Sequence, residues 1–517
     1  MSDKFSYDEF PYPSKFFLQT HPDRLAAAGI VYGMTPTPAE NCRVLELGCG
    51  NGSNLIAHAF GLPNSKFVGI DLAETHIAQA NRSVDELKLD NIEFKQTDVM
   101  DMTVEDFGEF DYITAHGLFA WVPDFVRSKV LSIFSKMLAP SGIGYISYNA
   151  YPGAYIREMV RSMMRFHTEG VDDPMAKVNS AIPFLGVLVN NSTEREIQGR
   201  ILEFELKRHF NHFPADIYHD DLGECYRPFH FYEFAGLLEQ NGLKFLSEAE
   251  LHASSFQGLS DEAIAFLDKI DDRLRREQYL DFFRGRVFRQ TLFCRTEIDL
   301  VDKPEPETLD RLYLSSTLQP TEKITNVGEQ RIVKFRSAKG QQIQIDHPLT
   351  KAALVHLGEI WGRSISGTDL LAAAKERLEA AGVLEDPARQ YEIARTVLLQ
   401  IAMGSDMIEL HSYAPRANTR VGEKPKVNVL ASWQLNDADN VLTLLNKDLR
   451  LSDKTSRRLL EILDGTRTKK DAATEMKGFI EKVDDINEKE RRDLLNNLPG
   501  WVDNSISELA RLGLFES

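Results

Sequence analysis

The sequence is poor in cysteine, in basic residues and in long apolar runs. Its four cysteines, Cys42, Cys49, Cys225 and Cys294, form no CxxC pair, so we expect neither a zinc knuckle nor a disulfide framework and interpret all four as buried thiols. No stretch reaches the roughly 18 apolar residues of a transmembrane helix, and the first ten residues lack the apolar segment of a secretory signal. These absences predict a cytoplasmic protein without membrane insertion.

The charge balance narrows the classes of partner. Lysine and arginine number 60 against 78 aspartates and glutamates, which gives a formal net charge of −18. Such a surface repels phosphate backbones, so nucleic acid is an unlikely partner, and it favours cationic ones. The histidines at 209, 212 and 219 have no acidic or thiolate ligands at a usual metal-site spacing, so we expect no metal.

A chain of 517 residues is too long for one hydrophobic core and is long enough for about three domains. From residue 43 to 148, short apolar runs alternate with helical patterns. The expected strands are 44–47, 67–71, 92–94, 110–114 and 144–148, and the expected helices are 53–60, 75–87 and 126–138. This alternation predicts an α/β fold, a Rossmann-like parallel sheet with helices on both faces.

The alternation pauses between residues 153 and 226, where helical patterns and an apolar run at 182–189 intervene. It resumes with a helix at 231–240 and strands at 243–246 and 290–294, the last of which mixes polar and apolar residues as an antiparallel strand does. We therefore predict one core, residues 1–298, with a helical insertion at about 153–226 that acts as a lid or a dimer surface. A separate small helical domain is the alternative interpretation of the insertion.

Two mainly helical modules are expected after a linker-like stretch near residue 301. Residues 299–420 contain helical patterns at 349–361, 367–380 and 391–402, and residues 421–517 contain them at 455–463, 469–479 and 502–511. Each series ends in a short apolar strand. Both segments are therefore predicted to be winged-helix-like modules.

The strongest motif is the turn after the first expected strand. Gly48, Gly50 and Gly52 follow a GxGxG spacing, which lets the backbone turn sharply and approach a ligand. A dinucleotide site favours GxGxxG, and Glu46, two positions before the first glycine, would repel a pyrophosphate but suits a cationic ligand. The turn therefore predicts a ligand with a positive charge in place of a phosphate.

Two more carboxylates follow the next strands. Asp71 ends the second strand, where a carboxylate can accept both hydroxyls of a ribose. Asp98, with Val99, follows the third strand and is placed to hold an adenine amino group. Together with Glu46 these residues predict a positively charged nucleoside; a dehydrogenase and an inactive version of the fold are the weaker alternatives.

Residues 43–148 resemble the class I methyltransferases that depend on S-adenosylmethionine (SAM). The resemblance implies SAM as the methyl donor and no metal. It assigns the methionine end of SAM to the acidic and glycine motif, Glu46, Gly48, Gly50, Asn51 and Gly52. It assigns the ribose to Asp71, and the adenine to Leu72, Asp98 and Val99. His116, after the fourth strand, and Tyr12, near the N-terminus, complete the predicted cofactor contacts.

A narrower resemblance covers most of the chain. The segments at 11–13, 19–24, 148–153 and 289–294 are similar to those of bacterial methyltransferases that carry a methyltransferase regulatory domain. That group is similar to the lysine methyltransferases of outer-membrane proteins, which implies a protein substrate and a helical dimerisation insertion, hence a possible homodimer. A small-molecule methyltransferase and a non-catalytic SAM-sensing regulator are the alternatives.

Aromatic residues after the fourth and fifth strands are the candidates for the acceptor site. A lysine amine must lose its proton before it attacks, and a partly desolvated aromatic channel lowers its pKa. We predict Trp121, Tyr148 and Tyr151 as the walls of this channel, where their rings could also hold the methylated cation. The sequence identifies no general base.

Overall fold

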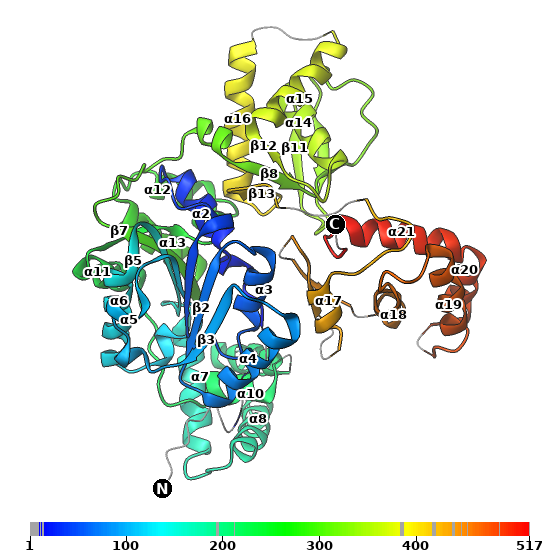
Figure 1. The fold of residues 1–517 in the computed structure, drawn as a ribbon. Coiled ribbons are helices and arrows are strands. Elements are labelled where there is room, and N and C mark those ends of the chain that lie inside the picture. Colours follow the sequence, from blue (N-terminus) through cyan, green and yellow to red (C-terminus); the bar gives the residue numbers. More distant parts are fainter. Residues whose placement is uncertain are drawn as a thin grey trace.

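A seven-stranded sheet forms the centre of the N-terminal half in the computed structural model (Figure 1). The structure describes residues 10, 12, 15–192, 196–210, 212–382, 387–415, 420–436, 440–445, 447–451, 453–484 and 486–515. The strands are β1 (Arg43–Leu47), β2 (Lys66–Asp71), β3 (Ile92–Gln96), β4 (Phe110–Ala115), β5 (Leu138–Asn149), β6 (Leu243–Glu248) and β7 (Phe288–Arg295). Their order is β3-β2-β1-β4-β5-β7-β6.

The first five strands are parallel, and β7 runs antiparallel between β5 and β6. The prediction that residues 243–296 return to the sheet of residues 44–148 is therefore confirmed. Because parallel strands end at one edge, the loops after β1, β2, β3, β4 and β5 meet at their carboxyl ends, where open α/β sheets bind ligands.

Successive side chains of a β-strand point to opposite faces of the sheet. In this sheet each face packs against its own apolar core. The core helices are α2 (Pro22–Val31), α3 (Ser53–Gly61), α4 (Glu74–Leu87), α5 (Val104–Phe107), α6 (Asp124–Met137), α11 (Phe231–Gln240), α12 (Asp261–Leu267) and α13 (Arg273–Arg284). Val44 and Tyr145 pack in a cluster with α2, α3 and α4, whereas Leu45 and Ile146 pack in a second cluster with α6 and α11. Among the described residues, six short 3-10 helices also connect elements of the chain.

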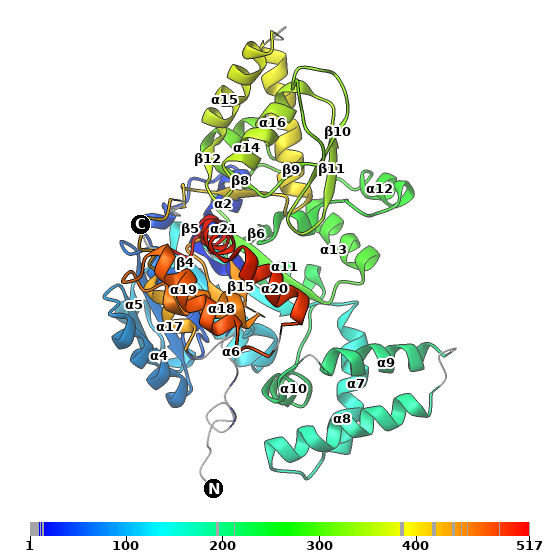
Figure 2. The same ribbon diagram turned by 90° about the vertical axis from the view of Figure 1, so that its right-hand side faces the viewer.

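The helical insertion lies beside the sheet rather than in it (Figure 2). It consists of α7 (Ala154–His167), α8 (Pro174–Asn190), α9 (Ile197–His209) and α10 (Pro214–Asp221). Val160, Leu185 and Leu202 belong to a small apolar core of its own. The predicted helical character of the insertion is confirmed.

The middle segment has two small sheets and three helices. Its elements are η6 (Pro306–Arg311), β8 (Tyr313–Ser316), β9 (Gln319–Pro320), β10 (Val333–Arg336), β11 (Gln342–Ile345), α14 (Pro348–Glu359), β12 (Ile365–Ser366), α15 (Gly367–Ala380), α16 (Pro387–Gly404) and β13 (Ile408–His411). The sheet orders are β12-β8-β13 and β11-β10-β9. One apolar cluster runs from Leu25 of α2 to Leu354 of α14, so this segment is packed directly on the core.

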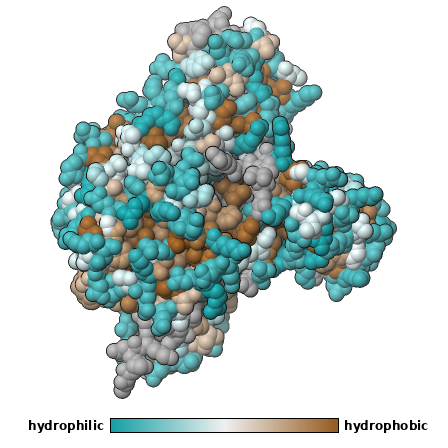
Figure 3. Space-filling model, viewed as in Figure 1, coloured by the Kyte–Doolittle hydropathy of each residue, from teal (hydrophilic) through white to brown (hydrophobic). Residues whose placement is uncertain are grey.

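The C-terminal segment has a separate apolar core. It contains α17 (Val429–Gln434), β14 (Asn440–Leu442), β15 (Asp448–Arg450), α18 (Lys454–Ile462), α19 (Lys469–Ile480), α20 (Glu488–Asn496) and α21 (Leu498–Arg511). It touches the N-terminal core through α17 and α4, where Trp433 Nε1 donates a hydrogen bond of 2.8 Å to Glu86 Oε2. On the face shown in Figure 3, hydrophobic residues gather mainly over the core and near the hollow between the core and this segment.

One expectation for the cysteines is wrong. Cys42, Cys49 and Cys294 are buried, and burial raises the pKa of Cys42 and of Cys294 to about 12. Cys225 is exposed, because it lies in the loop between the insertion and α11 rather than in a strand. Within the described ranges, no helix has the length and apolar character needed to cross a membrane, and no three His, Cys, Asp or Glu side chains are grouped as a metal site requires.

Candidate active site

The turn after β1 is built from three glycines in the left-handed region. Their φ angles are +71° at Gly48, +54° at Gly50 and +77° at Gly52. A Cβ atom at Gly52 would lie 2.5 Å from the ring of Phe94, whereas one at Gly50 would meet no atom within 4 Å. Gly52 is therefore required both for its conformation and for space, and Gly50 leaves room for a ligand.

Glu46 is the buried carboxylate behind this turn. Only 3% of it is exposed, and its Oε1 accepts a hydrogen bond of 2.7 Å from Asn54 Nδ2. Its Oε2 is also buried and has no hydrogen-bond partner in the described part of the chain. Burial raises the pKa of Glu46 to about 7. An unpartnered buried carboxylate oxygen is costly, and the ammonium group at the methionine end of SAM fits it.

Asp71 is tied to the glycine turn. Its Oδ2 accepts a hydrogen bond of 2.8 Å from Gly50 N, and its Oδ1 accepts one of 2.9 Å from Ala73 N. Each carboxylate oxygen keeps acceptor capacity for a further donor. The half-buried Asp71 side chain is thus fixed at the end of β2, where it can receive ribose hydroxyls.

The predicted adenine contacts lie at the ends of β2 and β3, which are neighbours in the sheet. Asp98 Oδ1 accepts a hydrogen bond of 2.9 Å from Met100 N and so caps η3 (Val99–Asp101). Val99 packs against the core, while Leu72 and Met100 are large apolar side chains with 42% and 38% of their surface exposed. Exposed apolar groups on adjacent strand ends suit a flat base, and Met100 is a candidate that the sequence interpretation missed.

His116 follows β4 and is held between aromatic rings. Its ring stacks on Phe17 with centroids 3.7 Å apart, and its Nδ1 lies 2.7 Å from the hydroxyl oxygen of Tyr145. Burial, with a smaller contribution from Lys15, lowers the pKa of His116 to about 3. The imidazole is therefore neutral and adds no positive charge beside a sulfonium.

Tyr12 belongs to an N-terminal segment that lies against the insertion. Lys15 Nζ donates a hydrogen bond of 3.3 Å to its hydroxyl and lies 2.8 Å from Asp216 Oδ1 of α10. The Tyr12 ring is also 6.0 Å from that of His219 in α10. Residues 11 and 13 of the predicted motif lie outside the described residues.

The N-terminal segment also reaches the glycine turn. Phe17 N donates a hydrogen bond of 2.9 Å to Asn54 Oδ1, and Asn54 Nδ2 donates one of 3.0 Å to Thr20 Oγ1. Asn54 therefore joins this segment to Glu46. Neither Phe17 nor Asn54 was among the predicted site residues; Asn54 follows the glycine motif by two positions, which was the available signal.

The three predicted acceptor-channel residues are not brought together. Tyr151 stacks on Tyr155 with centroids 4.1 Å apart and donates hydrogen bonds of 3.0 Å to both carboxylate oxygens of Glu158. Trp121 lies beneath the guanidinium groups of Arg157 and Arg161, which are 5.6 and 5.5 Å from its ring centroid. Both residues thus contact α7, the first helix of the insertion.

Tyr148 occupies a different place from the one predicted. It is 1% exposed and stacks on Phe234 in the core beneath α11, with centroids 4.3 Å apart. The alternation of β5 turns Tyr148 to the face opposite Tyr145 and Ser147, whose side chains contact His116 and Gly117. Asn149 lies on the Tyr145 side at the strand end, and its buried Oδ1 has no hydrogen-bond partner in the described structure. Asn149, rather than Tyr148, therefore belongs with the candidate site residues.

This sheet and its carboxylate and glycine turn define a class I SAM-dependent methyltransferase. Family models match residues 38–202 as a methyltransferase domain, residues 214–295 as a predicted methyltransferase regulatory domain and residues 423–514 as a PKMT C-terminal winged helix domain. The chain belongs to the family of SAM-dependent methyltransferases that carry a methyltransferase regulatory domain and this winged helix domain.

Two similar proteins match nearly the whole chain. The structure of PKMT2 from Rickettsia typhi in complex with AdoHcy is 26% identical, covers 98% of this chain and all of its own, and has a TM-score of 0.85. The uncharacterized protein RP789 of Rickettsia prowazekii is 27% identical over 494 residues, which span 93% of this chain and 87% of that protein. RP028 of the same organism is 33% identical over 248 residues, 47% of this chain and 98% of that protein.

Proposed function

We propose that this enzyme methylates lysine side chains of proteins. The observation that carries the proposal is the similarity to PKMT2 from Rickettsia typhi along 98% of the chain, including the segments beyond the methyltransferase sheet. The sheet by itself suits many acceptors, because function depends on the site added to a fold. The match of residues 423–514 to the PKMT winged helix domain adds support from outside the sheet.

The chemistry requires alignment and the exclusion of water more than a dedicated catalytic group. When bound, SAM supplies an electrophilic methyl group that an amine can attack in line. The chain would hold the methionine ammonium group with Glu46 and the ribose with Asp71. Alignment of the bound SAM with the acceptor amine would supply effective molarities on the order of 10⁵ to 10⁸ M.

The acceptor would enter beside Tyr151 and Asn149 at the end of β5. Asn149 Oδ1 is a buried acceptor without a hydrogen-bond partner in the described chain, so it can receive a hydrogen bond from an incoming amine. Burial and the neighbouring Glu158 carboxylate raise the pKa of Tyr151, which keeps its hydroxyl protonated at neutral pH. The formal net charge of −18 favours a cationic substrate such as a lysine-bearing polypeptide.

The proposal assigns a different role to each segment of the chain. Residues 1–298 would catalyse the methyl transfer. Residues 299–420 and 421–517 would be winged-helix-like modules that bind the substrate or regulate the enzyme. The insertion would be a dimer surface, because Ile197, Phe204 and Phe210 expose 65–72% of their surface, more than an isolated helical layer ordinarily leaves uncovered.

The test transfers labelled methyl groups from SAM to a mixture of proteins that includes outer-membrane proteins, followed by peptide mass spectrometry. The expected result is mass increments of one to three methyl groups on lysine. A matched Asp71→Ala variant should leave the mixture unmodified. Label only in dialysable products would favour a small-molecule acceptor, and label on carboxylates or nucleic acid would also contradict the lysine assignment.

A further inference from the structure

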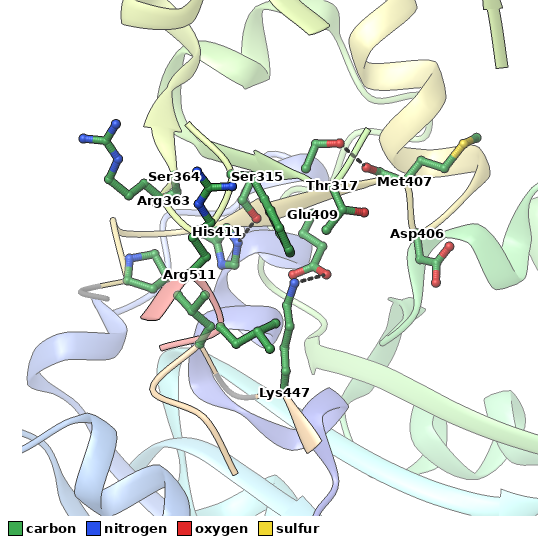
Figure 4. A pocket seen from close by; sticks show the side chains of 16 residues that line it. Ser315, Thr317, Arg363, Ser364, Asp406, Met407, Glu409, His411, Lys447 and Arg511 are labelled. Carbon is green, nitrogen blue, oxygen red and sulfur yellow. Dashed lines mark hydrogen bonds and ion pairs between the residues drawn. The ribbon is translucent and has the colours of Figure 1, made fainter. Parts of the chain in front are cut away.

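A cavity lies between the middle segment and the C-terminal segment, far along the chain from the glycine turn (Figure 4). The middle segment lines it with Ser315, Trp361, Arg363 and Ser364 and with the β13 residues Glu409 and His411, and the C-terminal segment contributes Lys447 and Arg511. The backbones are close here, since a Cβ atom at Gly362 would lie 2.5 Å from the carbonyl oxygen of Arg511.

The acidic groups at this junction already have cationic or hydrogen-bonding partners. Glu409 lies between two cations: its Oε2 is 2.9 Å from Arg24 Nη2, and its Oε1 is 3.3 Å from Lys447 Nζ. Asp406 Oδ2 is 2.5 Å from Lys339 Nζ. Each carboxylate that lines the cavity thus has a cation from within the protein, although Asp406 Oδ1 is buried without a hydrogen-bond partner among the described residues.

The arginines of the cavity have no such partners. Arg511 lies over the Trp361 ring, 5.7 Å from its centroid, and neither Arg511 nor Arg363 has a side-chain ion pair with a described carboxylate. Ser364 Oγ is shielded from solvent and has no hydrogen-bond partner among the described residues. An excess of positive charge thus remains, with an unused hydroxyl beside it, in a protein whose formal net charge is −18.

We propose that this cavity binds a small oxyanion, a phosphate or a carboxylate group of a metabolite. A guanidinium presents donors in a planar fork that matches the oxygens of either group, and charge-assisted hydrogen bonds of this kind are the stronger ones in proteins. Arg511 and Lys447 would contact the anion from the C-terminal segment and Ser364 from the middle segment, while Arg363, an exposed side chain at the rim of the cavity, would add positive charge there. Bound anion would therefore join the two segments.

The same junction holds the helix that leads to the cofactor site. His411 Nδ1 lies 2.7 Å from Asp23 Oδ2, and Arg24 pairs with Glu409, so β13 contacts the first turn of α2. That turn directly follows η1 (Leu18–Thr20), and Thr20 accepts the hydrogen bond from Asn54, the partner of Glu46. An anion that draws Lys447 from Glu409 would alter this chain of contacts and so change the affinity for the cofactor.

The experiment measures the binding of inorganic phosphate and of acetate to the full chain by isothermal titration, at constant ionic strength set with sodium chloride. Saturable binding of either anion is expected, and Arg511→Gln should weaken it about tenfold. Arg363→Gln should also weaken the binding of the anion. This second variant keeps the test valid if Arg511→Gln fails to fold. Arg492→Gln, at an exposed position of α20 in the same C-terminal segment, should bind as the unchanged protein does.

The second measurement is the affinity for S-adenosylhomocysteine, with and without the anion. A change of about threefold or more is expected in the unchanged protein and not in Arg511→Gln. Absence of saturable binding, binding that survives both Arg511→Gln and Arg363→Gln, or an equal loss in Arg492→Gln would each overturn the proposal. None of these readouts depends on the identity of the methyl acceptor.

Discussion

Asn54 Nδ2 lies 2.7 Å from Glu46 Oε1, and this hydrogen bond satisfies only half of a carboxylate that is 3% exposed. The other oxygen of Glu46 is buried without a partner among the described residues. The protein therefore carries the desolvation cost of Glu46 until a cation arrives.

The first prediction follows from the pKa of Glu46. Burial raises this pKa to about 7 in the unliganded protein, and only the ionised carboxylate attracts the ammonium group of the ligand. The affinity for S-adenosylhomocysteine should therefore fall by up to about tenfold per pH unit below pH 7. Above pH 7 the affinity should become constant. Isothermal titration from pH 5.5 to 8.5 measures this dependence.

Glu46→Gln is the matched control for that titration. It should bind weakly at every pH and lose the pH dependence, because the amide does not titrate. A raised carboxyl pKa also means that burying Glu46 costs the unliganded protein stability, and this cost sets in as the pH rises from the usual carboxyl pKa toward 7. An unchanged slope in Glu46→Gln would show that another group titrates.

The second prediction separates two glycines of the same turn. Gly52→Ala places a Cβ atom 2.5 Å from the Phe94 ring at a φ of +77°, whereas Gly50→Ala meets no atom within 4 Å at a φ of +54°. Urea unfolding should show a loss of about 1–2 kcal/mol for Gly50→Ala, from conformation alone. Gly52→Ala should lose at least about 1–3 kcal/mol more, from overpacking. Equal losses would contradict the steric argument.

The third prediction concerns the acceptor side. Tyr151→Ala removes a ring that is stacked on Tyr155 and a hydroxyl bound to Glu158. With a protein substrate, kcat/KM should fall about 10- to 100-fold through misplacement of the acceptor, while the affinity for S-adenosylhomocysteine stays unchanged. Tyr148→Phe serves as the comparison, because its ring remains in the core and its activity should change little. Loss of cofactor binding in Tyr151→Ala would place this residue in the cofactor site instead.

The fourth prediction tests the insertion as a dimer surface. Ile197 and Phe204 are seven residues apart on α9, hence on one face of the helix, and are 70% and 65% exposed. Light scattering should find a dimer for the unchanged protein and a monomer for the double variant Ile197→Ser with Phe204→Ser. Exchange of the half-buried Glu203, which pairs with Lys207, for Gln on the same helix should leave the dimer intact. A monomer in all three proteins would refute the prediction.

Local pattern was enough for the methyltransferase sheet. Helices predicted at 53–60 and 231–240 are observed as Ser53–Gly61 and Phe231–Gln240, because apolar periodicity and glycine turns are properties of neighbouring residues. The winged-helix character predicted for the C-terminal module is likewise confirmed by the family match to residues 423–514. Short strands such as β8, β10 and β14 were missed, since three or four residues carry too little periodicity.

The face of the sheet to which each side chain points was harder to predict from the sequence. Tyr148 lies within β5 and Tyr151 follows it, and the alternation of the strand sends Tyr148 into the core beneath α11. Asn54 and Phe17 were missed because they are 37 residues apart and meet only in the folded chain.

The sequence by itself determined the sheet, its glycine turn and the carboxylates that we expect to select a cationic nucleoside, because each depends on residues that are close along the chain. Tertiary structure alone decided which groups remain unpartnered. Glu46 Oε2 is a candidate binding group only because burial removes water from it, and Arg24, Glu409 and Lys447 meet only because β13 packs against α2. Burial and contact over hundreds of residues are properties of the packed chain, and no local pattern encodes them.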